Sequence, residues 1–242
     1  MYTYQAPPKR SRAVKAAIWV AAVIVLLVAL DFGARAFAES QAATQIQKHG
    51  FPKKPSVSFG GFPFLTQVIT RHFDQITIKS SQIPAGPIKI TRLDVVAHNV
   101  KMNSSFQSGT AGPLNGTLLI SLGEIGSFLS AAGPLASFLG GGGSGGGLHI
   151  KSVGSSELKG SLKLASGLLS WSAVWQVKSA GPHEIDLVLV RSHGLPGSLR
   201  SSASNVKLPL SSLPANLTLT GKINTSGKGI TAHVHAASIA FG

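Results

Sequence analysis

The chain has 242 residues, 43% of them apolar, and a formal net charge of +14 from 22 lysines and arginines against 8 acidic residues. It contains no cysteine, which excludes disulfide bonds, thiolate metal ligands and a cysteine nucleophile. The length suits one full-sized domain with an appendage. The basic balance favours an anionic partner, either nucleic acid or an anionic membrane surface.

The N-terminal segment combines a basic flank, residues 1–15, with an apolar run. The 15 residues from Ala16 to Leu30 carry no charge, and a helix of this length spans about 22 Å. A bilayer core is about 30 Å thick, but residues 32–34 can extend the helix past Asp31. We expect a transmembrane signal anchor over residues 16–34, with the basic segment in the cytoplasm as the positive-inside rule predicts.

Two other interpretations of this segment are open. A cleaved signal peptide is one, because Ala36 to Ala38 form a small-x-small site before Glu39. The site lies far beyond the apolar run, which favours the anchor. A buried core helix is the other, and the basic flank at the extreme terminus disfavours it. With either an anchor or a signal peptide, the rest of the chain leaves the cytoplasm.

The exported part, from Glu39 onward, carries 17 cationic and 7 anionic side chains. Its location argues against nucleic acid, as do basic residues that are scattered without interleaved aromatic side chains. An anionic membrane surface attracts the same charges, at about 1 kcal/mol per residue near the surface. A cationic surface that only keeps the protein soluble is the alternative interpretation.

A period of two dominates the chain beyond a helical stalk, which we expect over residues 35–55. Apolar and polar residues alternate over 76–78, 118–122, 158–164, 171–177, 185–189, 217–223 and 230–234. Such alternation is typical of half-buried antiparallel strands. Gly-, Pro- and Asn-rich turn signals separate these segments. We therefore expect a single β-rich domain over residues 56–242.

Two segments break the alternation. Leu65, Val68 and Ile69 have helical spacing after a proline, which suits a first helical turn. The second segment predicts a kinked or two-part amphipathic helix that divides at Pro134. Its apolar stripe consists of Ile125, Phe128, Leu129, Ala132, Leu135, Phe138 and Leu139. It runs into Gly140–Gly147, which is all glycine except for one serine and predicts a flexible loop.

Catalytic and metal sites find little support in the sequence. Glu184 and Asp186 share a strand face and could act as an acid/base pair, but a solvated strand face is the simpler interpretation. His233 and His235 also share a face, without a third ligand nearby in the sequence. We therefore expect a protein that is not an enzyme, with no catalytic residue, no metal and no cofactor.

The stretch GFPFLTQVITRHFDQITIKS, residues 61–80, resembles the hallmark of the LmeA-like phospholipid-binding family of bacterial cell envelopes. Residues 89–102 and 213–241 are similar to strand regions of that family, and the resemblance spans residues 30–242. It implies an α+β fold in which a mostly antiparallel curved β-sheet wraps an amphipathic helix, as in tubular lipid-binding proteins. An N-terminal transmembrane helix precedes this domain.

The resemblance also implies phospholipid as the partner, with its acyl chains in an apolar trough. Each buried CH₂ contributes about 0.8 kcal/mol. The residues expected to line or plug the trough are Phe59, Phe62, Phe64, Leu65, Val68, Ile69, Phe73, Ile125, Phe128, Leu129, Leu135, Phe138 and Leu139. A solid core without a cavity is the alternative interpretation of these residues.

Two functions follow from these expectations. The first is an envelope protein that binds phospholipid and supports lipid or glycolipid assembly. The second is an anchored, non-catalytic module that binds another envelope protein through exposed strand edges.

Overall fold

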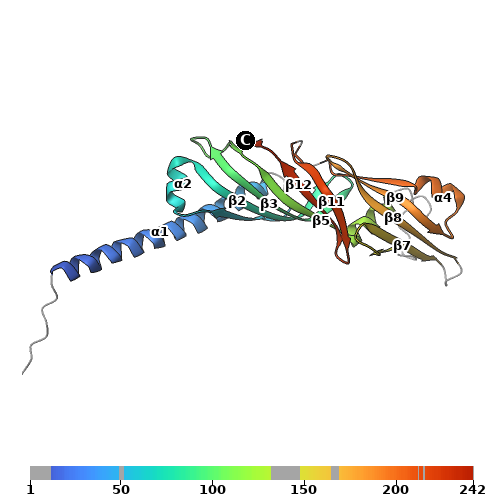
Figure 1. Ribbon diagram of the computed structural model, residues 1–242, viewed down its shortest axis with the longest axis horizontal. Coiled ribbons are helices and arrows are strands. Elements are labelled where there is room, and N and C mark those ends of the chain that lie inside the picture. Colours follow the sequence, from blue (N-terminus) through green and yellow to red (C-terminus); the bar gives the residue numbers. More distant parts are fainter. Residues whose placement is uncertain are drawn as a thin grey trace, which may run out of the picture.

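The computed structural model of the protein describes residues 12–48, 52–131, 148–164, 169–211, 213–214 and 216–241. The molecule is elongated. A long N-terminal helix, an eight-stranded sheet and a five-stranded sheet follow one another along its longest axis (Figure 1).

The helices and strands occur in the following order. The first half contains α1 (Arg12–Lys48), β1 (Ser56–Gly60), α2 (Phe64–Thr70), β2 (His72–Ala85), β3 (Ile88–Met102), β4 (Gly109–Ala111), β5 (Leu114–Ser121) and α3 (Leu122–Ala131). The second half contains β6 (His149–Ser152), β7 (Glu157–Leu164), β8 (Leu169–Gly181), β9 (Glu184–His193), α4 (Gly197–Ser202), β10 (Asn205–Pro209), β11 (Thr218–Ser226), β12 (Gly229–Ala236) and β13 (Ile239–Phe241).

Helix α1 unites the apolar run and the expected stalk in one continuous helix of 37 residues, about 55 Å long. Alanine and leucine favour this conformation throughout. By length and composition, α1 is a candidate membrane span, and only 6% of its most apolar stretch is buried against the rest of the described chain. Beyond that stretch, Ala34, Ala38, Ala42, Ala43 and Ile46 pack on the domain.

The eight-stranded sheet has the order β1-β2-β3-β5-β12-β11, with β4 pairing with β3 and β13. Every strand pair is antiparallel. The alternation seen in the sequence becomes alternating burial: Leu118 and Ile120 on β5 and Ile230, Ala232 and Val234 on β12 are buried. The expected α+β class with mostly antiparallel sheets is confirmed.

The five-stranded sheet, order β10-β9-β8-β7-β6, is an insertion between α3 and β11. It is also antiparallel. Trp175 lies at its centre, fully buried, with its indole N–H donating to the carbonyl of Ala203 at 3.0 Å. Alternation alone does not indicate that the strands divide between two sheets, since the period is the same in both.

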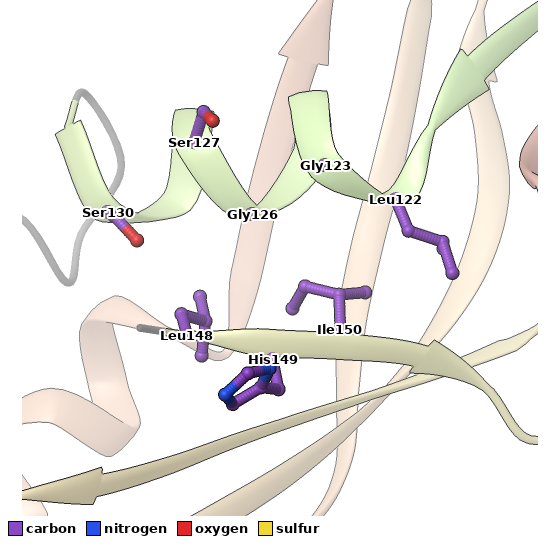
Figure 2. A pocket seen from close by; sticks show the side chains of 8 residues that line it. All are labelled: Leu122, Gly123, Gly126, Ser127, Ser130, Leu148, His149 and Ile150. Atoms are coloured by element: carbon purple, nitrogen blue, oxygen red, sulfur yellow. The ribbon is translucent and has the colours of Figure 1, made fainter. Parts of the chain in front are cut away.

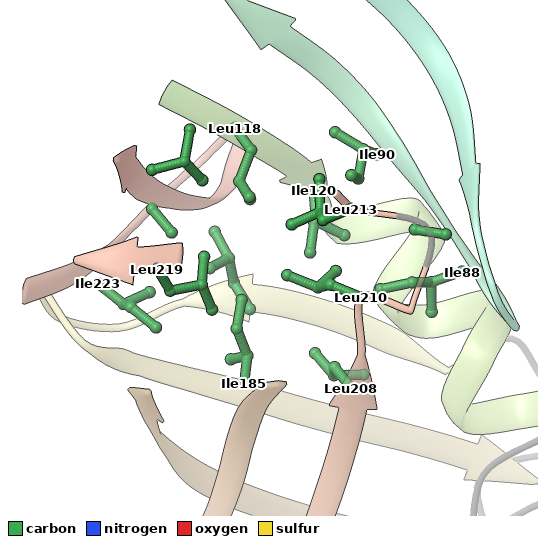
Figure 3. Packing of buried hydrophobic residues seen from close by; sticks show 14 of the residues in the cluster. Ile88, Ile90, Leu118, Ile120, Ile185, Leu208, Leu210, Leu213, Leu219 and Ile223 are labelled. Carbon is green, nitrogen blue, oxygen red and sulfur yellow. The ribbon is translucent and has the colours of Figure 1, made fainter. Parts of the chain in front are cut away.

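One hydrophobic core joins the two sheets (Figure 3). Ile88 and Ile90 of the first sheet belong to the same cluster as Leu208 on β10 and Leu210 directly after this strand. Strand β11 adds backbone bonds across the junction, because the Leu219 amide donates to the Pro182 carbonyl at 2.9 Å. The two sheets therefore form one packed body.

Candidate functional site

The residues expected to bind lipid occupy two separate places in the fold. Phe59 to Phe73 lie where α1 meets β1, α2 and β2, which we call the anchor junction. Ile125, Phe128 and Leu129 lie on α3, farther along the chain. Leu135, Phe138, Leu139 and the Gly140–Gly147 tract lie outside the described residues.

Three phenylalanines form the interior of the anchor junction. Phe59, Phe64 and Phe73 are buried, with ring centroids 5.1 to 6.1 Å apart. These are the distances of favourable tilted aromatic pairs. Helix α2 forms where its helical spacing predicts, one residue after Pro63. Packed against one another, the three rings hold α2 to the sheet.

Two carboxyl groups of α1 attach this helix to the junction. Asp31 is buried, and its side-chain oxygens accept hydrogen bonds from the backbone N–H groups of Phe64 at 3.0 Å and Leu65 at 2.7 Å. The first N–H groups of a helix lack partners within it, so Asp31 caps α2 from a distant part of the chain. Glu39 accepts the N–H of Phe59 at 2.9 Å.

Gln67 connects the strands on either side of α2. Its buried side-chain amide donates to the Gly60 carbonyl and accepts the Asp74 N–H, both at 3.0 Å. Gly61 has φ +86°, and a Cβ there would lie 2.5 Å from side-chain atoms of both Gln67 and Asp74. Only glycine fits this turn. The motif residues thus build the junction through ring contacts and hydrogen bonds.

The remaining side chains of this stretch point outward. Phe62 is 63% exposed, Leu65 38% and Ile69 78%, while Val68 is half-buried against the core. The ring of Phe62 lies 6.4 Å from that of Phe32 on α1. Whether these residues contact lipid stays a prediction.

Helix α3 has two unlike faces. Ile125, Phe128 and Leu129 are buried and hold the helix on the sheet. The other face is formed by Leu122 and by four residues with small side chains or none: Gly123, Gly126, Ser127 and Ser130. A Cβ added at Gly126 would come no closer than 3.5 Å to its neighbours, and one at Gly123 would come no closer than 3.9 Å.

This small-residue face opposes β6 across a groove of about 440 Å³ (Figure 2). Leu122, Leu148 and Ile150 lie in the gap, and Ser130 and His149 complete the lining. The volume is within the range of small-molecule pockets, about 300–1,000 Å³. Leu148 and Ile150 point toward α3 and Ser130 points toward β6, whereas the side chains of Ser127 and His149 point away from the gap (Figure 2). The apolar side chains suit a hydrocarbon chain, and Ser130 is available for a polar contact.

Sequence reasoning identified the buried face of α3 and missed the groove on the other face. Gly126, Leu148 and Ile150 were not candidates. The candidates on this helix were chosen by the spacing of apolar residues, which leaves out a glycine on the opposite face and residues of the next strand. The available signal was the glycine and serine positions three and four apart, which alternate with the apolar stripe around the helix.

Of the alternative sites considered in the sequence, Glu184 and His235 have ordinary polar partners, and the buried Oδ1 of Asp186 has no hydrogen-bond partner among the described residues. Glu184 accepts a hydrogen bond from Lys207 Nζ at 2.7 Å, and this bond raises the pKa of Lys207. His235 Nδ1 lies 2.9 Å from Asn115 Oδ1. Among the described residues, no group of three or more His, Cys, Asp or Glu is placed to hold a metal ion.

The fold defines a class: an α+β protein with open antiparallel sheets and a long apolar N-terminal helix, with a groove between α3 and β6. A family model described as LmeA-like phospholipid-binding matches residues 29–235. The chain belongs to this family, as the resemblance of residues 61–80 predicts. Searches of curated proteins and of solved structures returned no match.

Proposed function

We propose that the protein is a non-enzymatic phospholipid-binding protein of the cell envelope that holds an acyl chain in the groove between α3 and β6. The observation that carries this proposal is the groove itself. It offers about 440 Å³ beside apolar side chains, in a member of a phospholipid-binding family. Leu122, Leu148 and Ile150 are the contacts we assign to the acyl chain, and Ile125, Phe128 and Leu129 support α3 behind it.

The energetics suit a protein that loads and releases lipid. A 16-carbon chain gains on the order of 10 kcal/mol on leaving water, at about 0.8 kcal/mol per CH₂. It gains little on leaving a bilayer, which is equally apolar. Lipid can therefore move between membrane and groove without a large free-energy difference. A function in envelope lipid or glycolipid assembly follows from such exchange.

We further propose that α1 stays attached as a single-pass anchor in the cytoplasmic membrane, with residues 1–15 inside and the domain outside. The proposed segments are 16–34 for the span, 35–55 for the stalk and 56–242 for the domain. Cleavage after Ala38 would remove Asp31, whose carboxyl group caps α2. The family match also begins before that site, at residue 29. Both observations favour the uncleaved chain.

The test is the lipid that co-purifies with the full chain in mild detergent, quantified by mass spectrometry. We expect about one phospholipid per protein. Gly126→Leu places a branched side chain in the groove, so bound lipid should be largely lost, whereas Gly126→Ala should retain it because its Cβ meets neighbours at 3.5 Å. Circular dichroism of both variants checks that they fold.

Two results would contradict the proposal. One is a wild-type chain that carries no phospholipid after gentle purification. The other is equal lipid in the Gly126→Leu and Gly126→Ala variants, which would show that lipid binds elsewhere. An anchored module that binds another envelope protein would then be the better explanation.

A further inference from the structure

Exposed apolar side chains gather where α1 leaves the domain. Phe32 on α1 is 58% exposed and lies beside Phe62, and Leu65 and Ile69 follow on α2. We call these four residues the α2 patch. Figure 1 shows α2 at the end of the domain from which the exposed part of α1 emerges. The apolar surface of α1 therefore continues onto α2.

The length of the apolar run places this patch at the edge of a bilayer. Between Lys15 and Asp31 only 15 uncharged residues are available, about 22 Å of helix. The hydrocarbon core is about 30 Å thick, so roughly five more residues of α1 are required at its outer end. Those residues begin at Asp31, level with the start of α2.

An aspartate at this depth would ordinarily oppose insertion, because an unpaired carboxyl group is costly in an apolar medium. Here Asp31 is only 5% exposed, and both of its side-chain oxygens accept backbone N–H groups of α2. Helix α2 thus shields Asp31 from lipid. It presents Phe62, Leu65 and Ile69 outward instead.

Basic side chains lie at the other end of α2. Arg71 is exposed directly after the helix, and its carbonyl accepts the N–H of Met102. The exposed Lys101 is the cross-strand neighbour of His72, and Asp74 is an acidic neighbour on β2. Cations beside an exposed apolar surface suit a layer of phosphate head groups above hydrocarbon.

We infer that α2 is a second membrane contact, which rests on the head-group boundary of the same phospholipid bilayer that α1 crosses. This inference depends on the proposed anchor and is independent of lipid binding in the groove. Two attachments, one across the bilayer and one on its surface, fix the height and tilt of the domain above the membrane.

The absence of native cysteine makes the test direct, because a single introduced cysteine accepts one spin label. The full chain is labelled at Ile69→Cys or Phe62→Cys and reconstituted in nanodiscs of phosphatidylcholine and phosphatidylglycerol. Leu27→Cys on α1 is the reference for bilayer depth. Val190→Cys on β9, which is 50% exposed in the far sheet, is the matched reference for water. All four wild-type side chains are at least half exposed, and Ile69, at 78%, is the principal site because Phe62 also contacts the ring of Phe32.

Collision rates with oxygen and with a water-soluble nickel complex give the depth of each label. We expect labels at Ile69 and Phe62 to collide less often with nickel and more often with oxygen than the label at Val190 does. The label at Leu27 should show the same pattern as Ile69 and Phe62. The inference is wrong if Ile69 behaves like Val190. It is also wrong if Ile69 is shielded from both reagents, since a protein partner would then cover α2. A water-exposed Leu27 would overturn the anchor as well, and lipid in the groove would still be judged by the Gly126 variants.

Discussion

At the anchor junction, three packed rings and three hydrogen-bonded side chains contact one another closely, whereas the glycines and serines of α3 face Leu148 and Ile150 across a groove of about 440 Å³. The junction requires particular residues. Asp31 caps α2, Gln67 links β1 to β2, and the ring of Phe64 packs against two other rings. The groove combines small residues on α3 with Leu122, Leu148 and Ile150. The stretch that most resembles the family therefore attaches the domain to helix α1, and a less distinctive stretch forms the groove.

The largest expected loss of stability distinguishes two phenylalanines of the same motif, Phe64 and Phe62. Phe64→Ala should remove about 3–5 kcal/mol of stability, since it leaves a cavity in the aromatic cluster. For a chain of this size that corresponds to a fall in melting temperature of roughly 6–20 °C. Phe62→Ala, whose ring is 63% exposed, is the control and should shift the melting temperature little. Equal shifts in thermal unfolding of the two variants in detergent would contradict the packing described for the junction.

A smaller effect is expected at the polar attachment of α1. Asp31→Ala leaves the N–H groups of Phe64 and Leu65 without their acceptor, at a cost of about 1–3 kcal/mol. Amide hydrogen exchange at these two residues should accelerate, and the effect should be confined to α2 and the adjoining turn.

Asp94→Ala is the matched control, since Asp94 is partly exposed in a surface ion pair with Arg92. It should cost less than about 1 kcal/mol and leave the exchange of α2 unchanged. If Asp31→Ala left α2 exchange as slow as in the wild type, the cap would not stabilise the helix.

The smallest effect sharpens the description of the groove. Gly126→Ala should stabilise the chain by about 0.5–1 kcal/mol, because alanine is the better helix former and its Cβ has room. Gly160→Ala should destabilise it, because the added Cβ would lie 2.7 Å from the ring of Trp175. Thermal unfolding of both variants compares a glycine whose added Cβ would make ordinary contacts at 3.5 Å with one whose added Cβ would overlap a ring. A destabilised Gly126→Ala would mean that this face of α3 is already filled.

Much of the anchor junction could be predicted from local pattern. The helical spacing of Leu65, Val68 and Ile69 after a proline indicated α2. Which phenylalanine rings are buried and which are exposed could not be predicted. Phe62 and Phe64 are two residues apart and equally apolar, yet one is exposed and the other buried. The side that faces the core depends on where α1 docks.

The sequence by itself determined the elements of this protein: an apolar N-terminal helix, antiparallel strands with one buried face, and short amphipathic helices between them. Periodicity and composition act over a few residues, so they are visible without a fold. Only the tertiary structure decided that Asp31 caps a helix 33 residues away, that the strands divide into two sheets, and that the small side of α3 faces a groove. These features depend on which surfaces meet, and contacts between distant segments leave no periodic trace in the chain.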